Sequence, residues 1–120
     1  MGAVLVFLGG GLGCLIRYLL GLAFSKTTLT LPIATLSSNV LSCLIFAMTL
    51  MAFNDKIQGN PNLKIFILTG ICGGLSTFST FSFETFELLK QQQYFWAGSN
   101  ILLSLVLCLV IFFTFIGKLP

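Results

Sequence analysis

Four long apolar runs, separated by short polar segments, dominate the chain. They cover roughly residues 2–24, 31–53, 63–89 and 94–117. Each run reaches or exceeds the roughly 20 residues that an α-helix needs to cross a hydrocarbon core. The strongest turn signal between them, with Gly and Pro among polar residues, lies at residues 54–62. The pattern predicts an all-α integral membrane protein with four transmembrane helices, folded as a single domain over residues 1–120.

The third run is interrupted near its middle. Gly73 and Gly74 are poor helix-interior residues, and the serine and threonine residues after them compete for backbone hydrogen bonds. Irregular backbone at membrane depth is tolerated only where it is buried in protein or lines a cavity. Carbonyls freed at such a break can bind a cation, and freed N–H groups can face an anion. We therefore expect a third helix that is broken in mid-membrane and handles an ion there.

Two sets of side chains follow the expected break. Phe78 and Phe81 share one helix face, and Thr77, Thr80 and Glu84 share another. Phenylalanine usually faces lipid or packs in a core, but ring edges carry partial positive charge and can contact a small anion weakly. Conduction needs weak contacts of this kind. Glu84, near the end of the run, is either a polar pore residue or an interfacial one.

The first run combines glycines with one deep cation. Gly9 and Gly13 form a GxxxG pair, which permits close helix packing, and Arg17 lies on the same helix face. A charge at this depth is costly unless it snorkels, pairs or faces water. Arg17 therefore either reaches the nearby interface or supplies a fixed positive charge to a polar vestibule.

Polar residues also follow one face of the second run and one face of the fourth. Asn39 lies among small polar residues in the second run, and Asn100 and Ser104 share a face of the fourth. Amide groups inside a bilayer must be satisfied by hydrogen bonds. These residues either hold helices together or line a pathway with hydroxyl and amide donors.

Composition narrows the functional class. Of the 120 residues, 57% are hydrophobic and only 8% are charged, too few to cover a soluble surface. Histidine is absent, which excludes His-based acid–base chemistry and His-ligated metal. The six basic residues are scattered, which argues against nucleic-acid binding. No nucleophile–base pair or metal-ligand cluster is visible, so we do not expect an enzyme. The cysteines fall in separate runs without CxxC spacing and are expected to be small packing residues; they are Cys14, Cys43, Cys72 and Cys108.

The loop charges are divided almost evenly between the two sides of the membrane. With four crossings, one side holds Lys56, Lys64 and Lys118. The other side holds Lys26 and Lys90, with Arg17 leaning toward it. The positive-inside rule therefore gives almost no orientation. This balance favours a chain that inserts both ways and pairs as an antiparallel, dual-topology homodimer.

The polar side chains within the four apolar runs favour an anion over a cation as the transported ion. Carboxylates are nearly absent from the runs, whereas hydroxyls, amides and one arginine are present. We therefore expect an anion pathway in a dimer. A small proton-coupled multidrug exporter is an alternative, although it would need a deep carboxylate that the first run lacks. A non-transport membrane scaffold subunit is a further alternative, but it would leave the break and the polar faces unexplained.

Three segments resemble the signatures of the CrcB/Fluc family of fluoride channels. They are GGGLGCLIRY at residues 9–18, TLSSN at 35–39 and GICGGLSTFSTFSFE at 70–84. The similarity extends over essentially the whole chain, and the third segment is the most specific. The resemblance implies a multi-pass protein of the inner or plasma membrane that exports fluoride passively and relieves its toxicity. It further implies a dual-topology homodimer with two pores and a structural sodium ion, Na+, that is not transported.

By position, the resemblance also implies residue roles. The sodium ligands would be the backbone carbonyls of Gly73 and Ser76, although the family commonly has threonine at the latter position. The fluoride-facing rings would be Phe78 and Phe81, and Arg17 would lie at a vestibule. Donors along the pathway would be Asn39, Thr77, Ser79 and Thr80, to which the fourth run adds Ser104. Glu84 and Asn100 remain further polar pore candidates.

Overall fold

Helices account for nearly all of the described chain. The computed structural model describes residues 1–54 and 59–118, and no β-strand occurs within those two ranges. The helices are α1 (Gly2–Phe24), α2 (Ile33–Asn54), α3 (Pro61–Lys64), η1 (Ile65–Cys72), α4 (Gly73–Leu75), α5 (Phe78–Lys90) and α6 (Tyr94–Ile116). Four stretches are long and apolar enough to cross a membrane: Gly2–Phe24, Ile33–Phe53, Pro61–Lys90 and Tyr94–Ile116. The predicted all-α membrane fold with four crossings is confirmed.

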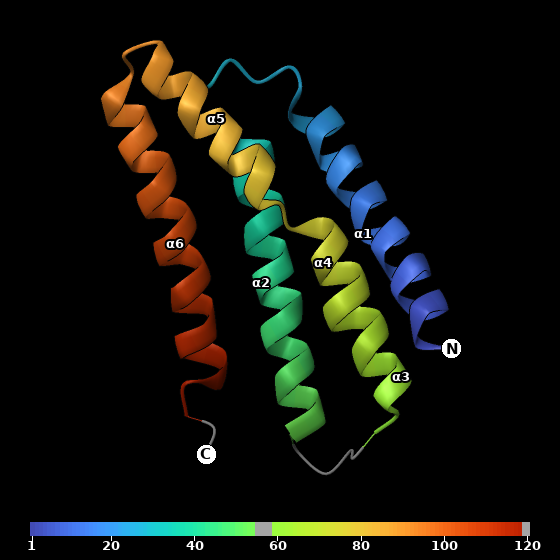
Figure 1. The fold of residues 1–120 in the computed structure, drawn as a ribbon. Helices are drawn as coiled ribbons and strands as arrows, with labels where there is room; N and C mark the ends of the chain where they lie inside the picture. The colour runs from blue at the N-terminus through green and yellow to red at the C-terminus, as the bar shows by residue number, and fades with distance from the viewer. Residues whose placement is uncertain (55–58, 119–120) are drawn as a thin grey trace.

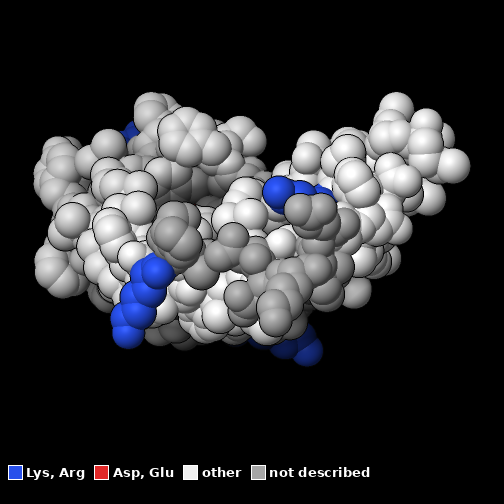
Figure 2. All heavy atoms as spheres, turned by 90° about the horizontal axis from the view of Figure 1, so that it is seen from below, with Lys and Arg blue, Asp and Glu red and all other residues white. Residues whose placement is uncertain are grey.

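The four crossings lie side by side (Figure 1). The N-terminus, the end of α2, the start of α3 and the end of α6 lie at one end of the bundle, and the other two connections lie at the opposite end. Figure 2 views the first of these ends and shows isolated basic side chains, with no acidic side chain in view on the described surface. Lys56 of the predicted charge balance falls outside the described residues.

The distribution of apolar side chains is that of a lipid-facing protein. Phe7, Phe95 and Phe113 expose 79%, 76% and 74% of their surface. The interior instead holds small and polar residues such as Ser38 and Ala47, both fully buried. Helices in lipid associate through close packing and interhelical hydrogen bonds, so polar groups gather inside the bundle.

The closest helix contact joins α1 to the first half of the third crossing. A Cβ atom built on Gly9 would lie 2.5 Å from the Phe66 carbonyl oxygen, and one built on Gly70 would lie 2.9 Å from the Gly9 Cα. Gly13 and Gly74 face the opposing backbone in the same way. The close packing predicted from the GxxxG pair is confirmed, with η1 and α4 as the partner of α1.

The third crossing is broken, as expected, but not at its glycine pair. Gly73 and Gly74 remain helical, whereas Ser76 and Thr77 have extended backbone with ψ of 152° and 117°. The glycine pair was therefore the wrong position for the break, and Gly74 serves the contact with α1 instead. The segment before it is also not a regular α-helix, since η1 is a π-helix. Local π geometry is rare and is frequently found at functional sites.

Candidate functional site

The helix break is held by a side chain of α2. The Thr77 N–H donates to Asn39 Oδ1 at 2.8 Å, and Asn39 Nδ2 donates to the Thr77 carbonyl at 3.4 Å. In a continuous α-helix, the Thr77 N–H would instead bond to the Gly73 carbonyl. Asn39 thus satisfies the backbone at the break through an interhelical hydrogen bond, which is one of the two alternatives that the sequence left open for its amide. The Gly73 carbonyl consequently loses its helical partner.

A second carbonyl is released on the other side of the break. The Thr80 N–H, which would bond to the Ser76 carbonyl in a continuous helix, donates to Thr77 Oγ1 at 3.2 Å. This is the usual N-cap arrangement for the start of α5. The Gly74 carbonyl, between the two, accepts a hydrogen bond from Arg17 Nε at 3.0 Å. The break therefore leaves the Gly73 and Ser76 carbonyls available for a ligand.

The two available carbonyls suit a hard cation. Gly73 and Ser76 both line a cavity of about 220 Å³, and both are exposed in the single chain. The Ser76 hydroxyl is already bonded to the Cys72 carbonyl at 2.8 Å, so the main-chain oxygen is the group left to coordinate. Carbonyl oxygens are preferred ligands of hard cations. The residues present therefore fit the sodium ion that the resemblance implies.

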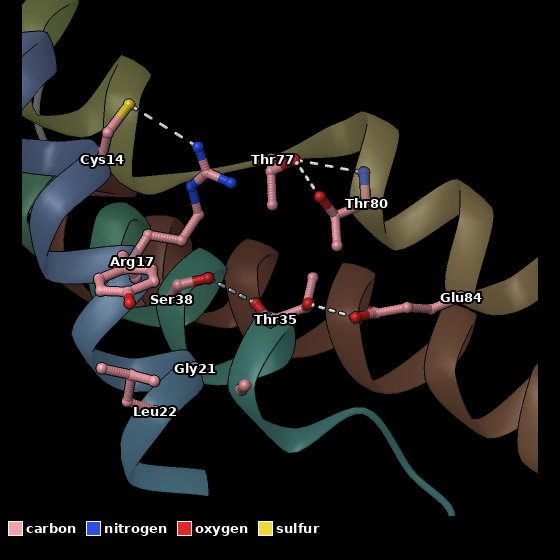
Figure 3. A pocket seen from close by; sticks show the side chains of 11 residues that line it. Cys14, Arg17, Gly21, Leu22, Thr35, Ser38, Thr77, Thr80 and Glu84 are labelled. Atoms are coloured by element: carbon pink, nitrogen blue, oxygen red, sulfur yellow. Dashed lines mark hydrogen bonds between the residues drawn. The ribbon is translucent and has the colours of Figure 1, made fainter. Parts of the chain in front are cut away.

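A polar cavity of about 540 Å³ lies between α1, α2 and α5 (Figure 3). Arg17, Thr35 and Glu84 line it, and Thr35 Oγ1 donates to Glu84 Oε1 at 2.7 Å. The Arg17 side chain points into this space from α1 and reaches the Gly74 carbonyl. Arg17 thus faces protein and a polar cavity, and its role at a vestibule stays a prediction. We call this space the vestibule cavity.

A second cavity, of about 260 Å³, lies beside the two phenylalanine rings. The centroids of the Phe78 and Phe81 rings are 6.0 Å apart, and the ring planes are inclined by 43°. Asn39 and Ser104 also line this space, which we call the ring cavity. Ser104 Oγ is buried and has no hydrogen-bond partner among the described residues, so its donor is free for a ligand. Phe78 is 80% exposed in the single chain.

Hydroxyl groups gather around Thr77. Thr77 lines both the vestibule cavity and the ring cavity. Its Oγ1 donates to Thr80 Oγ1 at 3.0 Å and lies 3.4 Å from Ser79 Oγ. The structure thus brings together Thr77, Ser79 and Thr80, which the sequence placed near one another only along the chain.

Asn100 does not join this group. It is buried, and its Nδ2 donates to Thr85 Oγ1 at 3.0 Å, so it links α6 to α5. Three other residues at the site were not among the predicted site residues. Ser42 Oγ donates to the Cys72 carbonyl at 3.0 Å, and Cys43 and Cys108 line the ring cavity. Their helical spacing was the available signal: each cysteine lies four residues after a predicted pathway residue, which places it on the same face.

Comparison with known proteins assigns the family. Residues 4–117 match the family described as CrcB-like protein, Camphor Resistance (CrcB). The chain belongs to the CrcB family. Proteins named "Fluoride-specific ion channel FluC" from Salmonella arizonae and Salmonella newport are each 42% identical to it over 101 residues. The match covers 84% of this chain and 80% of theirs.

The predicted family resemblance is therefore confirmed. Because this CrcB protein also has four apolar helices of membrane-spanning length, it is a multi-pass protein of the cell membrane. The roles assigned to individual residues of the two cavities and of the break stay predictions.

Proposed function

We propose that this CrcB protein is a fluoride-selective channel that passively exports fluoride from the cytoplasm and relieves its toxicity. Relatives at 42% identity are named fluoride-specific ion channels, and such a protein is a transporter and not an enzyme. The observation that carries the proposal is the break at Ser76 and Thr77. There, Thr77 lines both cavities and the two phenylalanine rings line the ring cavity.

The donor set suits fluoride. Fluoride is small, strongly hydrated and a strong hydrogen-bond acceptor, so hydroxyl and amide donors can replace its water. In the proposed route, the positive charge of Arg17 draws the anion into the vestibule cavity. The hydroxyls of Thr77 and Thr80 then take over its hydration. The ring edges of Phe78 and Phe81, with the free Ser104 hydroxyl, receive it in the ring cavity without holding it tightly.

The measurement that tests the function is fluoride efflux from liposomes that contain only the purified protein. A fluoride electrode should record rapid efflux that is absent from protein-free liposomes, and chloride efflux measured in parallel should be much slower. No fluoride efflux with sodium present, or equal rates for the two halides, would contradict the proposal.

The proposed functional unit is an antiparallel, dual-topology homodimer with one pore beside each chain's rings. The exposed positions of Phe78, Gly73 and Ser76 support it, because these are the groups that a second copy would cover. Orientation is testable with a single cysteine at Asn62→Cys, an exposed position, in a cysteine-free protein. In intact cells, an impermeant maleimide should label part of the population and leave part protected. Labelling of all or none would reject dual topology.

The proposed structural ion is sodium, held by the carbonyls of Gly73 and Ser76. Two carbonyls from one chain are few for a hard cation, whereas a symmetry-related chain would supply an equal set. The bound ion would then be coordinated by carbonyls of both chains and would hold the two helix breaks against each other. We expect the thermal stability of the detergent-purified protein to rise with sodium and less with potassium at equal ionic strength. Equal stability in both salts would contradict a sodium-selective site.

The alternative functions fit the site less well. A proton-coupled multidrug exporter needs a deep carboxylate in its first helix, and α1 contains Arg17 and no acid. A scaffold subunit would not need a membrane-embedded break whose carbonyls and hydroxyls face cavities. The efflux experiment separates both alternatives from the channel.

A further inference from the structure

Two thiols from different helices meet in the wall of the ring cavity. Cys43 of α2 and Cys108 of α6 both line this cavity, and neither is in a disulfide. The two side chains therefore lie near each other in the wall of a cavity of about 260 Å³. Both side chains are partly exposed in the single chain, so the pair borders open space and is not sealed in a core. The fluoride pathway proposed above uses neither thiol.

We propose that Cys43 and Cys108 form a two-thiol binding site for a soft metal cation. Thiolate sulfur is a soft ligand and selects soft cations over hard ones such as sodium or magnesium. Within residues 1–54 and 59–118, no group of three or more His, Cys, Asp or Glu side chains is placed to hold a metal. The pair therefore lacks the four-ligand set of a structural zinc site. Two thiols suit ions that accept linear coordination by two sulfurs, such as Hg2+, Cu+ and Ag+.

Binding of a soft metal by the two thiols is a ligand exchange that needs no oxidant or reductant. A mercuric ion forms two Hg–S bonds, the two thiol protons leave to water, and no electron is transferred. The product is neutral, because the two thiolate charges cancel the charge of the cation. A neutral complex avoids the large penalty for burying net charge in an apolar cavity. The hard carbonyl ligands at Gly73 and Ser76 would not compete for this ion.

The position of the pair gives the site a functional consequence. The thiols share the ring cavity with Phe78 and Phe81. Because that cavity is only about 260 Å³ in volume, a metal held at its wall takes space from an ion passing the rings. The site would thus make fluoride conduction sensitive to soft metals.

The first test measures binding without transport. The reference protein carries Cys14→Ser, because Cys14 is an exposed thiol on α1 that would compete for metal. Detergent-purified protein is titrated with mercuric chloride alone, and the thiolate-to-metal charge-transfer absorbance is followed. We expect saturation at one ion per chain. Adding Cys43→Ser or Cys108→Ser should abolish that signal, with alanine variants as a second check, whereas Cys72→Ser should keep it.

Two outcomes of the titration would overturn the site. One is an unchanged titration when Cys43 or Cys108 is replaced. The other is an equal loss with Cys72→Ser, the matched buried control, which would mean that the signal does not come from this pair. Circular dichroism of each variant before titration separates loss of a ligand from loss of fold.

The second test places the site in the pathway. In liposomes, mercuric chloride should slow fluoride efflux of the Cys14→Ser reference by roughly tenfold, and dithiothreitol should restore it. Each variant is compared with its own rate before metal is added, and Cys43→Ser and Cys108→Ser should be insensitive. Unchanged efflux at saturating metal would overturn the location in the pathway wall. Absence of efflux before any metal is added would contradict the proposed function instead, and the binding titration would still decide the site.

Discussion

Arg17 Nε donates to the Gly74 carbonyl at 3.0 Å and thereby joins α1 to the end of the helical stretch that precedes the break. A cation at a helix C-terminus interacts favourably with the partial negative charge of the last carbonyls. The same guanidinium lines the vestibule cavity. Arg17 therefore positions the break and supplies charge to the vestibule, and these two contributions can be separated by mutation.

Replacing Arg17 separates charge from geometry. Arg17→Lys keeps the positive charge but loses the planar Nε donor, whereas Arg17→Gln loses the charge as well. We expect both variants to be less stable by about 1 kcal/mol. Only Arg17→Gln should lose the enhancement of fluoride efflux at low ionic strength, because screening acts on the vestibule charge. The measurement is efflux at low and high salt with thermal unfolding in detergent. The same salt response in both variants would remove the charge from the mechanism.

Removing the Asn39 amide should disable the break. In Asn39→Ala, the Thr77 N–H loses its partner inside the membrane, which costs about 1–3 kcal/mol. We expect lower thermal stability together with a large loss of fluoride efflux. The control is Thr49→Val in the same helix, which removes a hydroxyl bonded only to the Ile45 carbonyl one turn earlier. Equal effects in the two variants would show that Asn39 is an ordinary packing residue.

Adding a methyl group at the α1 contact should destabilise the fold. In Gly13→Ala, the new Cβ would meet the backbone at Ile71 and Leu75, which cannot rotate away as a side chain can. Overpacking of this kind costs about 1–3 kcal/mol. Gly11→Ala is the matched control, since nothing lies within 4 Å of a Cβ there. The measurement is the melting temperature of monodisperse protein in detergent. Similar melting temperatures for the two variants would contradict the close contact.

Replacing a ring of the ring cavity should slow transport without unfolding the protein. Phe78→Ile and Phe81→Ile keep apolar bulk but remove the polarised ring edge. We expect efflux to fall by about tenfold or more, since several weak contacts act in series. Phe86→Ile lies on the same helix, is exposed and is not among the residues that line the ring cavity, so it serves as the control. Normal rates in Phe78→Ile and Phe81→Ile would take the rings out of the pathway.

The helices and the existence of the break were predictable because they depend on local sequence. Twenty apolar residues in a row determine a crossing wherever they occur, and a serine- and threonine-rich segment after a glycine pair weakens a helix. The position of the break was not predictable in this way. It depends on Asn39, which is 38 residues away in the chain and supplies the partner for the Thr77 N–H.

The role of Gly74 was mistaken for the same reason. Low helix propensity is a local property, but the close approach of α1 is a tertiary one, and that contact keeps Gly74 within a helix. The sequence singled out Arg17 as a deep cation, whereas its bond to the Gly74 carbonyl depends on the packing of two helices. Asn100 is a residue whose polar character was evident from the sequence but whose contact was not. The sequence places Asn100 on a polar helix face, but only the fold shows that its amide donates to the Thr85 hydroxyl.

The break at Ser76 and Thr77 has one further consequence. It gives a single membrane crossing two sets of neighbours, because η1 and α4 pack on α1 whereas α5 packs on α6 (Figure 1). Substitutions before the break therefore act mainly on the contact with α1, and substitutions after it act mainly on the contact with α6 and on the proposed ion pathway. The packing of the bundle and the proposed ion pathway can therefore change independently of each other, although both depend on a single membrane crossing.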